Sequence, residues 1–198
     1  MRLSEQATVP GAALPVAAFK DHLRLGTGFA DDGQQDALAE GYLRAALAAI
    51  EGRIGKALLQ RGFLLVLQDW RDPAEQPLPV APVVEVGSVV LVDATGGRQS
   101  VAATHYRLVP DLQRPRIGAV GVLLPPVPND GHIEIAFEAG FGPNWSDLPP
   151  DLAQAVFLLA AQFYESRHEV GLGEPAMPFG VMALIERWRT VRVLGGGR

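Results

Sequence analysis

The feature that most constrains this chain is the order of its hydrophobic periods, which change from helical to strand-like and back to helical. Apolar residues recur at three- and four-residue spacing over about 32–59 and again over about 151–169. Between them, from about 62 to 138, short strand-like apolar runs alternate with proline and glycine turns. Because the strands are gathered in one stretch instead of alternating with helices, the pattern predicts an α+β fold rather than a parallel βαβ sheet.

The first helical stretch is expected to contain a short helix and a long one. Pro15 stands in the first turn of the short helix, where a missing N–H costs nothing, and Gly26 to Gly28 ends it. Asp32 as N-cap, with Gln35 three residues later, matches a capping box for the long helix. This helix is expected to reach about Leu59 and to be packed on more than one side.

Three glycines interrupt the long helix. They are Gly41, Gly52 and Gly55, and each weakens a helix relative to alanine. Tertiary contacts must therefore support this segment, and the close approach of a neighbouring helix would explain the glycines.

The stretch from 62 to 138 is expected to be an antiparallel β insertion between two long helices. Its last strand alternates cleanly, with Ile133, Ile135 and Phe137 on one face. The expected strands are Phe63–Trp70, Val83–Val92, Arg98–Val101, His105–Val109, Arg116–Val120 and His132–Phe137.

Two further helices are expected after the insertion. The second long helix runs from Asp151 to about Glu169, and a short one runs from Pro178 to about Trp188. The main apolar stripe of the long helix is Leu152, Val156, Leu159 and Phe163. Because the two long helices should pack on each other, residues 14–188 are predicted to form a single domain, with 1–13 as a lead-in and 189–198 as a C-terminal arm.

Composition excludes several classes of protein. Hydrophobic residues make up 48% of the chain and charged residues 20%, which is ordinary for a globular protein and unlike a disordered one. The absence of cysteine excludes a disulfide framework, a thiolate nucleophile and a cysteine-ligated metal site. No signal-peptide pattern begins the chain and no apolar run approaches about 20 residues, so we expect a soluble protein with no membrane partner.

The charge of the chain is unevenly distributed. The 17 Lys and Arg residues against 22 Asp and Glu give −5 overall, which argues against gripping nucleic acid with the whole surface. Residues 186–198 hold four arginines and one glutamate, a local balance of +3, so residues 1–185 carry −8. We interpret this basic tail on an acidic body as an arm that docks on an acidic partner.

No pattern in the chain predicts a catalytic, cofactor-binding or metal-binding site. Gly26-Thr27-Gly28 resembles the start of a dinucleotide fingerprint, but Asp31 stands where the third glycine belongs. The four histidines have no metal-ligand spacing. The densest polar cluster, Tyr164 to Glu169, could supply Glu165 and His168 as an acid–base pair, yet its place at a helix end favours a solvated face or a subunit contact.

Several short stretches, taken together and in order, resemble the head–tail connector (adaptor) family of siphophages and gene transfer agents. Each alone is only a turn or an apolar stripe, and their ordered sum, from about Leu14 to Arg192, carries the resemblance. The stretches are Leu14-Pro15-Val16, Lys20 to Leu25, Asp31-Asp32, Tyr42-Leu43, Ile50-Glu51, Gly55 to Leu58, Leu78 to Val83, Val86 to Val89, Tyr106 to Leu108, Arg114 to Ile117, Phe137 to Gly142, Leu148 to Ala155, Phe163 to Arg167 and Pro178 to Leu184.

The resemblance implies a structural, non-enzymatic subunit without a cofactor. It implies a ring of about twelve copies, built through heterologous contacts that close. The ring would lie under the portal protein and meet a stopper or tail-side connector at its other rim, with DNA passing through its lumen unread. The implied location is the head–tail junction of a virion-like particle that is assembled in the bacterial cytoplasm.

Portal binding is assigned, as a hypothesis, to the C-terminal arm. A basic, glycine-ended tail can become ordered when it meets a partner, and an acidic body that repels phosphate suits a DNA channel. The residues assigned to portal binding are Trp188, Arg189, Arg192, Val193 and Leu194.

Other assignments stay open at this point. A stopper or tail-terminator ring of the same particle is the nearest, although the resemblance implies that those proteins are mainly β. A small hydrolase using Glu165 and His168 is a second alternative, and a non-viral interaction module is a third. For Arg107, Arg114 and Arg116, an ordinary solvated hairpin is favoured over a contact with DNA or with a neighbouring subunit.

Overall fold

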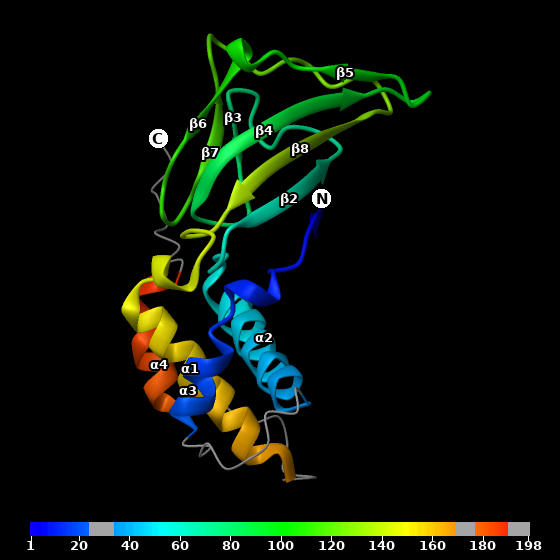
Figure 1. The fold of residues 1–198 in the computed structure, drawn as a ribbon. Coiled ribbons are helices and arrows are strands. Elements are labelled where there is room, and N and C mark those ends of the chain that lie inside the picture. Colours follow the sequence, from blue (N-terminus) through cyan, green and yellow to red (C-terminus); the bar gives the residue numbers. More distant parts are fainter. Residues whose placement is uncertain (24–33, 169–176, 190–198) are drawn as a thin grey trace. The chain divides into compact units, whose positions relative to one another are not determined.

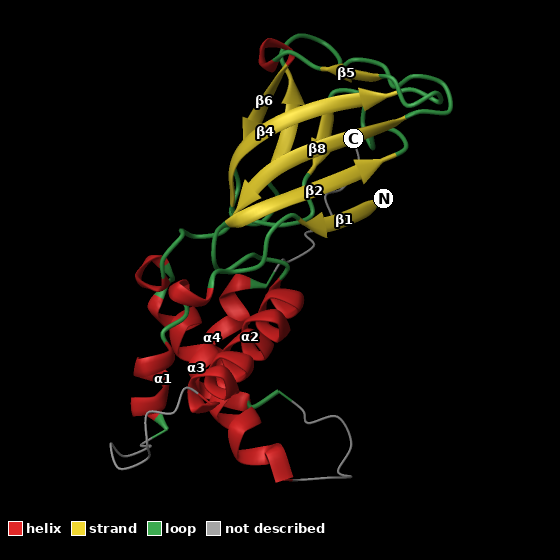
Figure 2. Ribbon diagram, turned by 45° about the vertical axis from the view of Figure 1, so that its right-hand side comes forward, coloured by secondary structure: helices red, strands yellow, loops and turns green. Residues whose placement is uncertain are grey.

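The structure is a computed structural model that describes residues 1–23, 34–168 and 177–189. These residues form two compact units. The sheet unit comprises Met1–Val9 and Gly55–Phe141, and the helical unit comprises Pro10–Ile54 and Gly142–Arg189. All the antiparallel strands except the first, Arg2–Glu5, lie in sequence between the two long helices, which confirms the expected α+β class (Figures 1 and 2). The single domain expected over 14–188 stays a prediction.

The sheet unit contains two antiparallel sheets. A five-stranded sheet has the order β1-β2-β8-β4-β5, and a three-stranded sheet has the order β3-β7-β6. The strands are β1 Arg2–Glu5, β2 Arg61–Leu67, β3 Glu75–Pro77, β4 Val83–Val92, β5 Arg98–Ser100, β6 Tyr106–Val109, β7 Arg116–Ala119 and β8 His132–Ala139. The chain therefore reaches the centre of the larger sheet last, when β8 inserts between β2 and β4.

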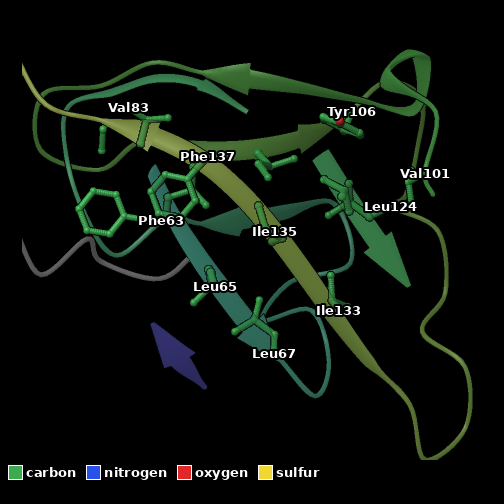
Figure 3. Close-up of a cluster of buried hydrophobic side chains, with 14 of the residues drawn as sticks. Phe63, Leu65, Leu67, Val83, Val101, Tyr106, Leu124, Ile133, Ile135 and Phe137 are labelled. Carbon is green, nitrogen blue, oxygen red and sulfur yellow. The ribbon is translucent and has the colours of Figure 1, made fainter. Parts of the chain in front are cut away.

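The core of the sheet unit lies between the two sheets. Ile133, Ile135 and Phe137 are at most 2% exposed, so the predicted alternation of β8 is confirmed. Phe63, which pairs with Phe137 on the neighbouring strand, stacks on it with ring centroids 5.6 Å apart. Figure 3 shows these side chains together with Tyr106 and Leu124, which close the core from the other side.

Gly140 is required where β8 leaves the sheet. Its φ of +141° is a conformation that residues with a Cβ rarely adopt. An added Cβ would also lie 2.4 Å from the backbone N and Cα of Gln60. The glycine thus permits a close backbone approach at the point where the chain returns to the helical unit.

The first strand was not foreseen in the sequence. Residues 1–13 were predicted to be a lead-in without a strand, yet Arg2–Glu5 forms the outer strand β1 and pairs antiparallel with β2. Glu5 there accepts a 2.8 Å hydrogen bond from Arg61, whose side chain is only 7% exposed. This long-range ion pair fastens the start of the chain to the sheet.

The helical unit contains two long and two short α-helices among its described residues. They are α1 Val16–His22, α2 Gln34–Ile54, α3 Pro150–Glu165 and α4 Phe179–Ile185. Single turns of 3-10 helix, η1 Gly11–Ala13, η3 Trp145–Asp147, η4 Ser166–His168 and η5 Glu186–Trp188, adjoin them. The expected N-cap of α2 at Asp32 lies outside the described residues.

The long helices end earlier than expected. The prediction that α2 reaches Leu59 is wrong, because Gly55 takes a φ of +70° directly after Ile54 and stops the helix. Residues Lys56 to Leu59 are buried in the sheet unit instead. α3 changes to 3-10 geometry after Glu165, short of the expected end at Glu169.

The core of the helical unit lies between α2 and α3. Leu43 and Ile50 of α2, like Leu152 and Val156 of α3, are completely buried, as expected for the stripe of α3. The ring of Phe19 in α1 packs on Phe157 of α3, with centroids 5.8 Å apart. No helix in the described part of the chain is long and apolar enough to cross a membrane.

The packing expected around α2 is only partly correct. Leu38 is 48% exposed, and Ala45 is exposed as well, so one side of the helix is not covered by the part of the chain that the structure describes. The expected close neighbour at Gly41 and Gly52 is also missing, because no described atom lies within 4 Å of a Cβ added at either position.

Candidate interaction surfaces

The described part of the proposed arm is fastened to the start of α3. Trp188 donates a 2.8 Å hydrogen bond from Nε1 to Oδ2 of Asp151. The same oxygen lies 2.7 Å from Nε of Arg187, whose guanidinium lies over the Trp188 ring at 4.8 Å from its centroid. Arg189, the next residue of the proposed arm, pairs with Glu186 at 3.1 Å. Arg192, Val193 and Leu194 lie outside the described residues.

Asp151 is the electrostatic centre of this anchor. Burial alone would raise the pKa of its carboxyl, but hydrogen bonds from Trp188, Arg187 and the backbone N–H of Leu152 outweigh burial and lower the pKa below its usual value. A carboxylate in the first turn of a helix is also favoured by the helix dipole. The turn η5 is thus held to α3 by a charged group.

A pocket of about 380 Å³ lies beside this anchor. Its lining consists of Pro150, Asp151, Ala183, Leu184 and Arg187. One carboxylate and one guanidinium, already paired with each other, provide its charge. Because these two groups are already paired, the lining is better suited to receiving a side chain from another protein than to catalysing a reaction.

A buried lysine fastens the β6–β7 loop of the sheet unit. Lys56 is 1% exposed and donates hydrogen bonds to the carbonyl oxygen of Leu112, at 2.5 Å, and to Oε1 of Gln113, at 3.0 Å. Desolvation lowers the pKa of Lys56, while Asp111 opposes that shift. Lys56 was not predicted to be a functional residue, although a lone lysine within an apolar run was the available signal. Because both hydrogen bonds go to one loop, its role is to position that loop.

Of the two residues considered for catalysis, only Glu165 has a described side chain. Glu165 is exposed at the end of α3, and the side chain of His168 lies outside the described residues. Arg167 of the same cluster stacks on the ring of Tyr164 and donates to the carbonyl oxygen of that residue. Among the described residues, no group of three His, Asp or Glu side chains could hold a metal ion.

The arginines of the β6–β7 hairpin have mixed surroundings. Arg116 pairs with Glu75 of β3 at 2.8 Å, across the small sheet. Arg107 is exposed on β6. These positions fit the solvated hairpin favoured from the sequence.

Two apolar surfaces are exposed that sequence reasoning did not single out. The loop after β7 presents Val120, Val122 and Leu123, which are 53%, 83% and 61% exposed. Both ends of that loop are held by backbone hydrogen bonds, from Val120 N to His105 O and from Leu124 N to Pro73 O. Phe179, at the start of α4, is 89% exposed. Contiguous exposed apolar residues, like those of the loop after β7, are typical of surfaces that contact other proteins.

Solved structures contain chains that are very similar to this one along its whole length. A chain in the neck of an empty gene transfer agent particle, computed with C6 symmetry, is 64% identical, with a TM-score of 0.90. Chains in the virion of a native gene transfer agent particle and in a native neck computed with C12 symmetry are 64% and 60% identical, with TM-scores of 0.87 and 0.84. Each match covers 99% of both chains. The chain belongs to the head–tail connector family of gene transfer agents.

Membership of this connector family rests on these solved structures. No family model matches the chain. A search of the curated proteins also found no match. The relatives are parts of a particle neck and of a virion. This agrees with the exposed surfaces described above, which offer contacts to other proteins rather than catalytic groups.

Proposed function

We propose that this connector-family chain is a structural, non-enzymatic adaptor subunit that forms a homo-oligomeric ring in the neck of a gene transfer agent particle. The observation that carries the proposal is identity of 60–64% over 99% of the chain to proteins of such necks. At this identity and with TM-scores of 0.84–0.90, surfaces as well as core are expected to be preserved. The C12 symmetry of one such neck supports a ring of about twelve copies.

The ring connects the head to the tail at a fixed position in the stack. One rim contacts the portal protein and the other a stopper or tail-side connector, and the subunits are assembled in the bacterial cytoplasm. DNA passes through the lumen without being read. The negative charge of the chain supports this last point, because an acidic wall repels phosphate and does not retain the passing duplex.

Portal binding is the function of the C-terminal arm in this proposal. Trp188 and Arg189 form its base, and Arg192, Val193 and Leu194 continue it. The Trp188–Asp151 hydrogen bond supports this assignment, because it fixes the point on α3 from which the arm departs. Arg192 and Arg198, which follow the ion-paired Arg187 and Arg189, supply positive charge for an acidic surface on the partner.

Deleting residues 189–198 should abolish attachment to the portal while leaving the fold intact. The deletion removes the exposed Arg189–Glu186 pair, which contributes little to stability, and keeps Trp188 on Asp151. Co-purification with portal-containing heads measures attachment, and the melting temperature of the isolated chain measures the fold. The matched control is Arg107→Ala, at an exposed arginine of the sheet unit. Normal attachment of the truncated chain would exclude the arm as the portal contact.

Electron microscopy of particles made without this gene tests the joining role itself. We expect DNA-filled or leaking heads that retain portals, together with separate free tails. Intact tailed particles would show that the chain does not join head to tail.

A further inference from the structure

The outward side of α2 is a long apolar face that no other described part of the chain covers. Six residues with helical spacing form it, and all are exposed. They are Ala37, Leu38, Gly41, Ala45, Ala48 and Gly52. They span 15 residue steps, or about 22 Å of helix. A surface helix normally carries its charged residues on this side, opposite the core-facing Leu43 and Ile50, but this face has none.

The two glycines on this face cost stability that no packing among the described residues offsets. A glycine within a helix is less favourable than alanine by about 1 kcal/mol. A Cβ at Gly41 or Gly52 would meet no described atom within 4 Å, so internal packing does not require glycine at either position. A flat face of glycine and alanine lets a second backbone or a large side chain come close. If another chain packs there, this close approach explains why glycine stands at positions 41 and 52.

The helical unit also presents a surface of complementary shape. Phe179, in the first turn of α4, is 89% exposed, so this large aromatic ring covers little of the described chain. Gly180 and Ala183 beside it are exposed as well. Together they form an uncharged turn from which one aromatic side chain protrudes.

We infer that the outward face of α2 in one subunit receives the Phe179 turn of α4 from the next subunit around the ring. The inference rests on the proposed ring. A closed ring needs two different, mutually complementary surfaces on every copy, and a flat apolar helix face and a protruding aromatic side chain meet that need. The occupant is a second copy because chains 60–64% identical lie in necks with C12 and C6 symmetry, where identical subunits are related by rotation about an axis.

Site-directed crosslinking in assembled particles tests the contact. The chain has no cysteine, so introduced thiols are the only ones it carries. Ala45→Cys with Ala183→Cys places one thiol on each surface and keeps Phe179. Packed helix axes lie about 8–10 Å apart, within reach of a short bismaleimide. Each thiolate adds to one maleimide, so no oxidant is needed.

We expect a ladder of dimers, trimers and larger multimers of this chain on a denaturing gel. Each single variant, and the control pair Ala45→Cys with Ala94→Cys at an exposed turn, should stay monomeric. Dimers from Ala45→Cys alone would indicate that α2 packs on its own copy, and would overturn the inference. A double variant that enters particles without forming multimers would overturn it too.

A second variant covers the case in which the cysteines disturb assembly. Ala45→Trp should leave the melting temperature of the isolated chain unchanged, because the site is exposed, but lower its incorporation into particles by about tenfold or more. Ala94→Trp is the matched control. Wild-type incorporation of Ala45→Trp would contradict the contact. If the unaltered chain is itself absent from particles, the proposed function fails, whereas its presence without crosslinks refutes only this contact.

Discussion

Replacing Asp151 by alanine should loosen η5 from α3 and destabilise the helical unit by about 2 kcal/mol. The hydrogen bond from Trp188 goes to a charged acceptor, and such a bond contributes about 1.5–3 kcal/mol. The carboxylate also lies in the first turn of α3, where the helix dipole adds about 0.3–1 kcal/mol. The ion pair with Arg187 adds little, because that side chain is 68% exposed. Water reaching the half-buried indole recovers part of the loss.

Urea denaturation of the full chain at pH 7, followed by circular dichroism, measures this loss. Asp151→Asn is the graded control, because it keeps an acceptor oxygen without the charge and should cost about half as much. A double-mutant cycle with Trp188→Phe isolates the hydrogen bond, and we expect a coupling energy of about 1–2 kcal/mol.

The pH dependence gives the same interaction an independent test. The pKa of Asp151 is lowered in the folded chain, so its contribution is complete above the ordinary carboxyl pKa of about 3.9 and is lost as the pH falls through the folded value. The stability difference between wild type and Asp151→Ala should therefore shrink below about pH 4. An unchanged midpoint of Asp151→Ala at pH 7, or a difference that persists in acid, would refute this account of the anchor.

Two further predictions concern the sheet unit. Ile135→Ala should destabilise it by about 2–5 kcal/mol in urea denaturation, because the side chain is fully buried and leaves a cavity. Val84→Ala, at a half-exposed position of the same sheet, should change stability by less than about 0.5 kcal/mol, and equal losses would contradict the described core. Gly140→Ala should sharply reduce the yield of folded protein, because the methyl group meets the backbone of Gln60 at a strained φ. Gly87→Ala, whose methyl would lie 3.6 Å from the carbonyl oxygen of Ala136, should fold normally, and similar yields for both variants would argue against that turn geometry.

The sequence alone determined the class of fold, the order of the α-helices and of six of the eight strands, and the family. Local periodicity was sufficient for this, because the spacing of Ile133, Ile135 and Phe137 can be buried in only one way on a sheet. The start of α3 at Pro150 followed from equally local signals. The family resemblance needed only the order of short motifs, and the solved neck structures bear it out.

Only the tertiary structure decided which surfaces are free and which residues form anchors. The pairing of Arg2–Glu5 with β2 and the bond between Trp188 and Asp151 join residues far apart in the chain, so no local pattern reports them. The exposed side of α2 is a similar case. Its alanines and glycines are equally compatible with a buried helix, and only the placement of α3 against the opposite side shows that this face is exposed among the described residues.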